Sequence, residues 1–282
     1  MGLRKTLAEP QVVTMFDIDL TQLPTSDELP CSDDTPVDNE DQNWLPNVLL
    51  FVLEYLWKDR QDWFFAVDMG VYHTTGVNPR VPVVPDGFLS LGVERRKGGK
   101  SRSSYVTWEE NYTPPILALE MVSQTPGGEY DTKLDIYARL GVLYYVVYNP
   151  SFWQRDRHLP FEVYKLVEGT YQLQMGEPCW MPEIGLGIGR CVLPFDPMDR
   201  EALGWFDQRG DRYLTPAERA EQEQRRAEQE QRRAEQEQRR AEQEQRRAEQ
   251  EQRRAEQEQQ RAERLADYLR SLGLDPDNLP NA

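Results

Sequence analysis

The sequence predicts an α/β domain built on a mixed β-sheet, followed by one long, highly charged helix. Three observations lead to this prediction. Apolar residues follow helical spacing near residue 50, whereas several later segments show the alternation or the short apolar runs of strands. Helical and strand segments are interleaved along the chain, as in mixed-sheet domains. From residue 220, a seven-residue unit repeats and large apolar residues are nearly absent until Leu265.

Residues 42–200 carry the patterns of the folded domain. The run PILALEMV is short and continuously apolar, which is typical of a central strand buried on both faces. Glu168-Gly169 is the expected turn of a hairpin. The predicted elements, in chain order, are a helix at 44–58, strands at 64–74, 86–91 and 115–122, a helix at 129–140, a strand at 143–149 and a hairpin at 161–175.

Four segments flank this domain. Residues 1–41 hold ten acidic and two basic residues with few apolar anchors, so we expect a disordered acidic leader. Residues 201–219 are expected to form a linker. Residues 220–261 form the repeat, and residues 262–282 are expected to form a short amphipathic helix and a tail.

The repeat consists of the unit AEQEQRR, in which alanine is the only apolar residue. It therefore lacks the two apolar positions per heptad of a strong coiled coil. Pairs such as Glu221 with Arg225 and Glu223 with Arg226 are spaced to attract one another on a helix surface. A single charged helix and a weak coiled coil both fit this pattern, and its expected role is a spacer or a homo-oligomerisation arm.

The overall composition excludes several classes of protein. The net charge is −16, so a nucleic-acid partner would have to be bound by a local basic patch. The three cysteines, Cys31, Cys179 and Cys191, form no C-x-x-C motif, which argues against a disulfide framework or a thiolate zinc site. The sequence shows neither a signal peptide nor an 18-residue apolar run, so we expect a cytoplasmic protein without a membrane span.

Glu120 is the most unusual residue of the predicted core, because it lies within the apolar run ILALEMV. Burying an unpaired carboxylate costs free energy, so Glu120 would need a metal ion, a cation or a proton. The alternative is a glutamate at the exposed end of the strand.

Asp86 and Lys133 are the other candidate site residues. Asp86 follows Pro85 at the start of a predicted strand, although Pro-Asp pairs also begin many turns. At 100° per residue, Lys133 falls within the apolar stripe of its helix. It therefore either extends past its neighbours to solvent or meets a buried carboxylate, for which Glu120 is the candidate. Two carboxylates on neighbouring strands with one lysine suit hydrolysis of a phosphodiester assisted by Mg²⁺ or Mn²⁺.

A basic, glycine-containing loop at 92–104 is the one candidate phosphate-binding patch. It is either a solvated loop or a surface that contacts nucleic-acid phosphates. Its basic residues are Arg95, Arg96, Lys97, Lys100 and Arg102.

The order and spacing of these residues resemble the bacterial restriction endonuclease-like proteins of the Uma family, within the PD-(D/E)xK nuclease superfamily. The resemblance covers roughly residues 42–200, and the tail closes on the sequence LGLDPD, as is common in that family. The matching residues are Pro85, Asp86, Glu120, Ser123, Tyr130, Asp131, Lys133, Tyr137, Ala138, Gly141, Val142, Tyr145 and Pro150.

The resemblance implies a restriction-endonuclease-like core in which Asp86 and Glu120 bind Mg²⁺ or Mn²⁺ and Lys133 is the catalytic lysine. The superfamily's usual lysine position, two residues after the second acid, holds Val122 here, so its role would pass to Lys133. Glu54 is a weak candidate for a third acid. The implied activity is endonucleolytic cleavage of nucleic acid, with DNA expected and RNA left open. The alternative is an inactive nuclease fold that serves as a binding scaffold, with the charged helix as its interaction element.

Overall fold

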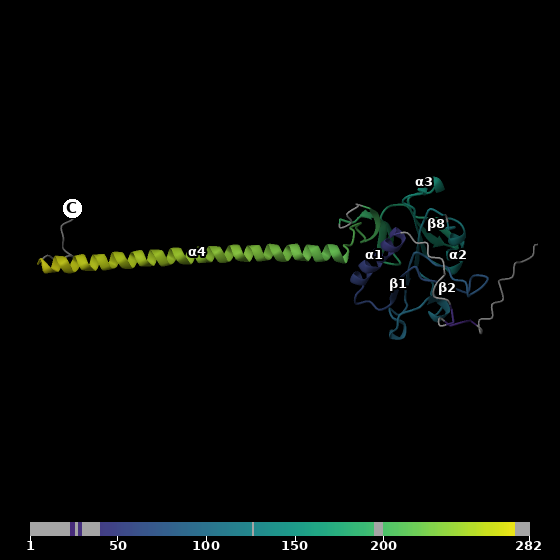
Figure 1. The fold of residues 1–282 in the computed structure, drawn as a ribbon, viewed down its shortest axis with the longest axis horizontal. Coiled ribbons are helices and arrows are strands. Elements are labelled where there is room, and N and C mark those ends of the chain that lie inside the picture. Colours follow the sequence, from purple (N-terminus) through teal and green to yellow (C-terminus); the bar gives the residue numbers. More distant parts are fainter. Residues whose placement is uncertain (1–22, 26–27, 30–39, 126, 195–199, 274–282) are drawn as a thin grey trace, which may run out of the picture. The chain divides into compact units, whose positions relative to one another are not determined.

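The computed structural model of the protein describes residues 23–25, 28–29, 40–125, 127–194 and 200–273 (Figure 1). The chain divides into two compact units, one ending at Glu218 and one beginning at Arg219. Most of the expected acidic leader lies outside the described residues.

The core of the first unit is a six-stranded mixed sheet, which confirms the predicted fold class. Neighbouring strands pair antiparallel except for β5 and β6, which are parallel. Its strands, in spatial order, are β1 (Trp63–Val67), β3 (Gly87–Leu91), β5 (Leu117–Met121), β6 (Tyr144–Tyr148), β7 (Phe161–Val167) and β8 (Thr170–Leu173).

Helices α1 (Glu40–Leu56) and α2 (Thr132–Leu140) contribute to two different hydrophobic clusters. Leu117, Leu119 and Met121 of β5 belong to the cluster that contains the apolar side chains of α1. Ala118, between them, belongs to the cluster that contains α2. Because successive side chains of a strand point to opposite faces, Glu120 must face the same side as Ala118, which is the side of α2.

A second, three-stranded sheet corrects the prediction that residues 201–219 form a linker. It consists of β9 (Cys179–Met181), β10 (Leu186–Val192) and β11 (Glu201–Phe206). Trp205 of β11 is fully buried, and its indole nitrogen donates to the carbonyl of Leu49 in α1 at 3.0 Å. The domain therefore continues beyond residue 200, because β11 supplies core side chains that pack against the first helix.

Short elements complete the first unit. The two-residue strands β2 (Val71–Tyr72) and β4 (Tyr105–Val106) pair in parallel. Leu29, from the segment expected to be disordered, is buried against this pair. Among the described residues, this unit also contains the 3-10 helices η2 (Lys97–Gly99) and η3 (Thr107–Glu109) and the short α3 (Trp153–Asp156).

Helix α4 (Pro216–Ser271) begins with a capping box. The Thr215 hydroxyl accepts from the Glu218 amide at 3.3 Å, and the Glu218 carboxylate accepts from the Thr215 amide at 2.8 Å. Pro216 occupies the first helical position, where its missing N–H leaves no intrahelical bond unmade. These local signals explain why the charged repeat begins its helix at this point.

Within the second unit, α4 continues without a break through residues 262–271, which were expected to form a separate short helix. The predicted pair of Glu221 and Arg225 is present, whereas no ion pair joins Glu223 to Arg226 among the described residues. The recurring contact is instead a glutamine amide donating to the glutamate four residues later at 3.1 Å, as in Gln224 to Glu228. No helix within the described ranges combines the length and apolar character of a membrane span.

We predict that the first unit folds without most of the charged repeat. A chain that ends at residue 226 keeps the capping box and the core residues of β11. It should unfold in one cooperative thermal transition and keep a mixed α/β circular dichroism spectrum, with the full-length chain as the control. A broad, non-cooperative transition in the shortened chain would show that the repeat stabilises the domain.

Candidate active site

The centre of the candidate site is the side chain of Glu120 on β5. It is 1% exposed, so the alternative of a glutamate at an exposed strand end is excluded. Lys133 Nζ donates to Glu120 Oε2 at 2.7 Å, and the Tyr137 hydroxyl donates to Glu120 Oε1 at 2.6 Å. Lys133 and Tyr137 are four residues apart on α2 and therefore lie on the same helix face. The sequence interpretation of Lys133 as a lysine that meets a buried carboxylate agrees with this geometry.

The charges of this pair depend on one another. Burial raises the pKa of Glu120 above 4.5, although the Lys133 ammonium and the Tyr137 hydroxyl act in the opposite direction. Burial alone would lower the pKa of Lys133, but the charge and hydrogen bond of Glu120 outweigh it and raise that pKa above 10.5. Lys133 is thus a firmly protonated ammonium beside the Glu120 carboxyl group.

Asp86 lies next to this pair because of the strand register. It immediately precedes β3, whose first residue, Gly87, is paired with Leu119 of β5. Asp86 Oδ2 accepts from the backbone amide of Met121 at 2.5 Å, and its negative charge is one of the influences that raise the pKa of Lys133. The structure therefore brings Asp86, Glu120 and Lys133 together at one end of the sheet.

Helix α1 contributes a polar side chain that the sequence analysis did not identify. Gln42 Nε2 contacts Asp86 Oδ1 at 3.4 Å and the carbonyl oxygen of Met121 at 3.5 Å. Glu54, the weak candidate for a third acid, instead forms an ion pair with Arg95 at 2.9 Å. The first helix thus meets the site through the Gln42 amide in its first turn, whereas Glu54, near its other end, pairs with Arg95 of the basic loop.

Tyr137 and Glu129 are the other site residues whose roles the sequence analysis missed. Tyr137 belongs to the apolar stripe of α2, which suggested only a core position. Glu129 is buried, its carboxylate accepts from the Gly127 amide at 2.9 Å, and its charge also raises the pKa of Lys133. The only sequence signal for Glu129 is its position beside the Gly-Gly turn that leads into α2.

The donor set fits a hard divalent cation that retains water ligands. Mg²⁺ is usually held in proteins by one or two carboxylates together with waters and substrate phosphates, and Asp86 and Glu120 supply two. Each carboxylate oxygen has two lone-pair sites, so the contacts from Lys133 and Tyr137 leave Glu120 able to coordinate an ion. In the described part of the chain, no cluster of three or more aspartate, glutamate, histidine or cysteine side chains is arranged to hold a metal.

The basic loop is largely neutralised by carboxylates. Arg95 pairs with Glu54, and Arg102 forms two hydrogen bonds to Glu110 at 2.9 and 3.1 Å. Lys97 pairs with Glu109 at 3.0 Å and lies 3.4 Å from Glu110. Arg96 and Lys100 are exposed and form no ion pair with the described residues. The five basic residues predicted as one patch therefore divide into three paired and two unpaired cations.

A comparison of the sequence with the profiles of known protein families identifies the family of this chain. The profile of the Uma2 family, described as "Putative restriction endonuclease", matches residues 35–188. This match spans more than half of the chain and includes Asp86, Glu120 and Lys133. The chain belongs to the Uma2 family, as the resemblance predicted.

Among solved structures, the chain is similar to one described as a putative nuclease belonging to DUF820 from Anabaena variabilis ATCC 29413. The identity is 11% and the TM-score is 0.37, over 52% of this chain and 74% of the other. No curated protein matches the chain.

The contact between Tyr137 and Glu120 yields a stability prediction. Tyr137→Phe should lower the free energy of unfolding by about 1–3 kcal/mol, because it leaves a buried carboxylate oxygen without its donor. In a Glu120→Gln background the same change should cost less, with a coupling of about 0.5–3 kcal/mol from urea denaturation. The matched control is Tyr171→Phe, whose hydroxyl donates to the carbonyl of Val142 and which should be additive with Glu120→Gln. Additivity for Tyr137→Phe as well would contradict the assigned contact.

Proposed function

We propose that this protein is a nuclease that hydrolyses phosphodiester bonds with the assistance of Mg²⁺ or Mn²⁺, and that Asp86, Glu120 and Lys133 carry the reaction. The observation that supports this most strongly is the Lys133 ammonium, held 2.7 Å from the buried carboxylate of Glu120, with Asp86 immediately before the neighbouring strand β3. Membership of a family described as restriction endonucleases supports the same class of reaction.

In this proposal Asp86 and Glu120 hold the metal ion. Such an ion, when bound, polarises the phosphate and lowers the pKa of a water molecule. The backbone amide of Met121 donates to Asp86 Oδ2 and thereby fixes the orientation of the Asp86 carboxylate. Glu120 is fixed by Tyr137, which acts as a positioning residue. Both carboxylates are therefore oriented before an ion binds, which lowers the entropic cost of binding.

Lys133 stabilises the negative charge that develops on the phosphate in the transition state. A cation that is already held in position is effective because it needs little reorganisation when the negative charge develops. The Glu120 charge raises the pKa of Lys133 and so keeps it protonated. The lysine is thus cationic at neutral pH.

The substrate we propose is nucleic acid, with DNA preferred over RNA because of the family description. The chain's overall charge of −16 repels polyanions, so binding must depend on local cations. The loop that carries Arg95, Arg96, Lys97, Lys100 and Arg102 is the proposed contact surface.

One observation favours a second function, an inactive nuclease fold that serves as a binding scaffold. Both oxygens of Glu120 are already hydrogen bonded, one to Lys133 and one to Tyr137. A buried ion pair can be purely structural, in which case removing either partner costs about 3–5 kcal/mol and metal has no effect.

Metal binding and cleavage distinguish the two functions. For the nuclease, Mg²⁺ or Mn²⁺ should raise the melting temperature of the wild-type chain, since a ligand that binds only the folded state stabilises it. Asp86→Asn and Glu120→Gln should each abolish that increase and the metal-dependent cleavage of DNA. Lys133→Ala should retain the increase in melting temperature but lose cleavage, because its charge acts on the transition state.

Lys165→Ala is the matched control for Lys133→Ala. Lys165 pairs with Glu183 at 2.6 Å, and its side chain is 26% exposed, the same fraction as that of Lys133. This control should retain both metal binding and cleavage. A wild-type chain that shows no metal-induced stabilisation, cleaves neither DNA nor RNA, and is destabilised by Glu120→Gln and by Lys133→Ala would support the scaffold and refute the nuclease.

A further inference from the structure

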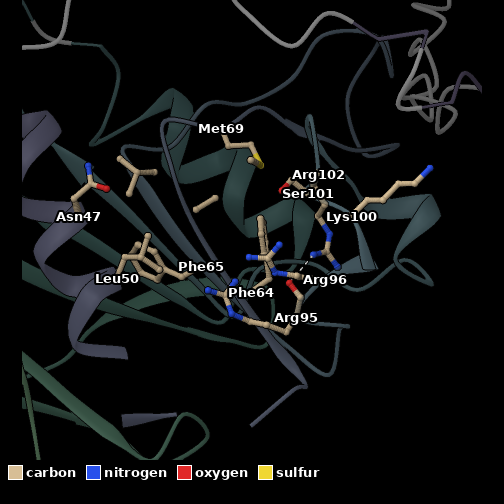
Figure 2. A pocket seen from close by; sticks show the side chains of 12 residues that line it. Asn47, Leu50, Phe64, Phe65, Met69, Arg95, Arg96, Lys100, Ser101 and Arg102 are labelled. Carbon is tan, nitrogen blue, oxygen red and sulfur yellow. Dashed lines mark hydrogen bonds between the residues drawn. The ribbon is translucent and has the colours of Figure 1, made fainter. Parts of the chain in front are cut away.

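A pocket of about 330 Å³ lies beside the edge strand β1 (Figure 2). The chain has a net charge of −16, yet among the residues that the structure describes, four cations and no aspartate or glutamate line this pocket. Figure 2 shows the side chains of Arg95, Arg96 and Arg102 near Phe64, with Asn47 and Leu50 on the other side and Lys100 extending outward. We call this the basic pocket.

Two of the four cations are fixed and neutralised by the protein itself. Arg95 pairs with Glu54, and its guanidinium lies 4.1 Å from the centre of the Trp63 ring. Arg102 pairs with Glu110, its side chain is 3% exposed, and its guanidinium lies 4.4 Å from the ring of Phe64. Stacked and paired guanidinium groups stabilise the wall of the pocket. Their carboxylate partners offset their positive charge, so they attract an anionic ligand only weakly.

The other two cations have no such partner in the described chain. Arg96 and Lys100 are both exposed. In the sequence, Arg96 follows the fixed Arg95, and Lys100 precedes the exposed Ser101. The 3-10 turn η2 between them brings the amide of Lys100 within 3.0 Å of the carbonyl of Lys97, which holds the loop compact. An unpaired arginine and lysine beside a hydroxyl are the groups that proteins use to bind phosphate oxygens.

The basic pocket extends toward the candidate active site along β1. Val67, which lines the pocket, pairs with Gly87, the residue that follows Asp86. The amide of Asp68 donates to the carbonyl of Asp86 at 3.3 Å. Asn47, on the other wall, lies on α1 little more than one helical turn after Gln42, which contacts Asp86. A strand bound at Asp86 and Glu120 could thus continue along β1 into the pocket.

We propose that the basic pocket binds a backbone phosphate of the nucleic-acid strand that is cleaved at Asp86 and Glu120, and that Arg96 and Lys100 make this contact. Arg95, Arg102 and Lys97 position the loop and do not contact the substrate. This inference rests on the proposed nuclease function. It assigns substrate binding to Arg96 and Lys100 and a structural role to the other three basic residues of the loop.

The two groups of residues should affect the reaction differently. Arg96 and Lys100 contact a phosphate remote from the bond that breaks, so they bind the substrate and the transition state equally. Removing such uniform binding raises KM and leaves kcat unchanged, whereas removing Lys133 lowers kcat.

The test is the equilibrium binding of a fluorescently labelled DNA duplex to the full chain in EDTA, where metal-dependent cleavage cannot occur, over a series of salt concentrations. The variant Arg96→Ala/Lys100→Ala should bind several-fold more weakly. The slope of log K against log salt should fall in magnitude by about 1 per lost phosphate contact.

The matched control is Lys58→Ala/Arg80→Ala, which removes two exposed cations outside the pocket and changes the net charge equally. The control should bind like the wild type.

Three outcomes have distinct meanings. If the pocket variant binds weakly and has a raised KM with an unchanged kcat, the inference and the nuclease function are both supported. If the pocket variant loses DNA binding but the wild type cleaves no nucleic acid with any metal, the pocket assignment is supported and the nuclease function fails. If the pocket and control variants bind equally, or the wild type binds no DNA in EDTA, the inference is overturned, whatever the cleavage assay shows.

Discussion

The arrangement around the sheet depends on one constraint, which is that the carboxyl group of Glu120 is buried in an apolar strand. An unpaired charge in this position would cost several kcal/mol, so its surroundings must supply compensating groups. Lys133 supplies a positive charge and Tyr137 supplies a hydroxyl donor. These two residues fix the rotation of α2 about its axis, because both must face β5.

The same constraint links elements that are distant in sequence. The alternation of β5 turns Glu120 toward α2, and the antiparallel register with β3 places Asp86 beside it. Helix α1 reaches the site through Gln42 and is held against the domain by the indole of Trp205 from β11. A buried carboxylate beside the hydrophobic cluster that contains α2 lowers the stability of the fold. Such a cost is easier to explain for a chemical site than for a core that needs only to pack.

The sequence contained most of the information about the site and less about the boundary of the domain. Glu120 could be identified because it interrupts an apolar strand, and Lys133 because it interrupts an apolar helix stripe. Tyr137 could not be identified as a site residue, since a tyrosine in such a stripe has the same periodicity as any core residue. The strand β11 was missed because glycine interrupts its short apolar run, and its burial depends on packing against α1, about 150 residues earlier. The pairing of Arg95 with Glu54 likewise depends on a tertiary contact that local sequence does not reveal.

The central claim is that Asp86 and Glu120 together bind a divalent ion next to Lys133, and X-ray diffraction from crystals soaked in Mn²⁺ tests it most directly. Anomalous scattering locates manganese without assumptions about activity. The account predicts one peak between the two carboxylates, about 2.1 Å from an oxygen of each, and its loss in crystals of Glu120→Gln. A saturating soak that leaves this position empty, with Lys133 still bonded to Glu120, would contradict the claim and favour a purely structural ion pair.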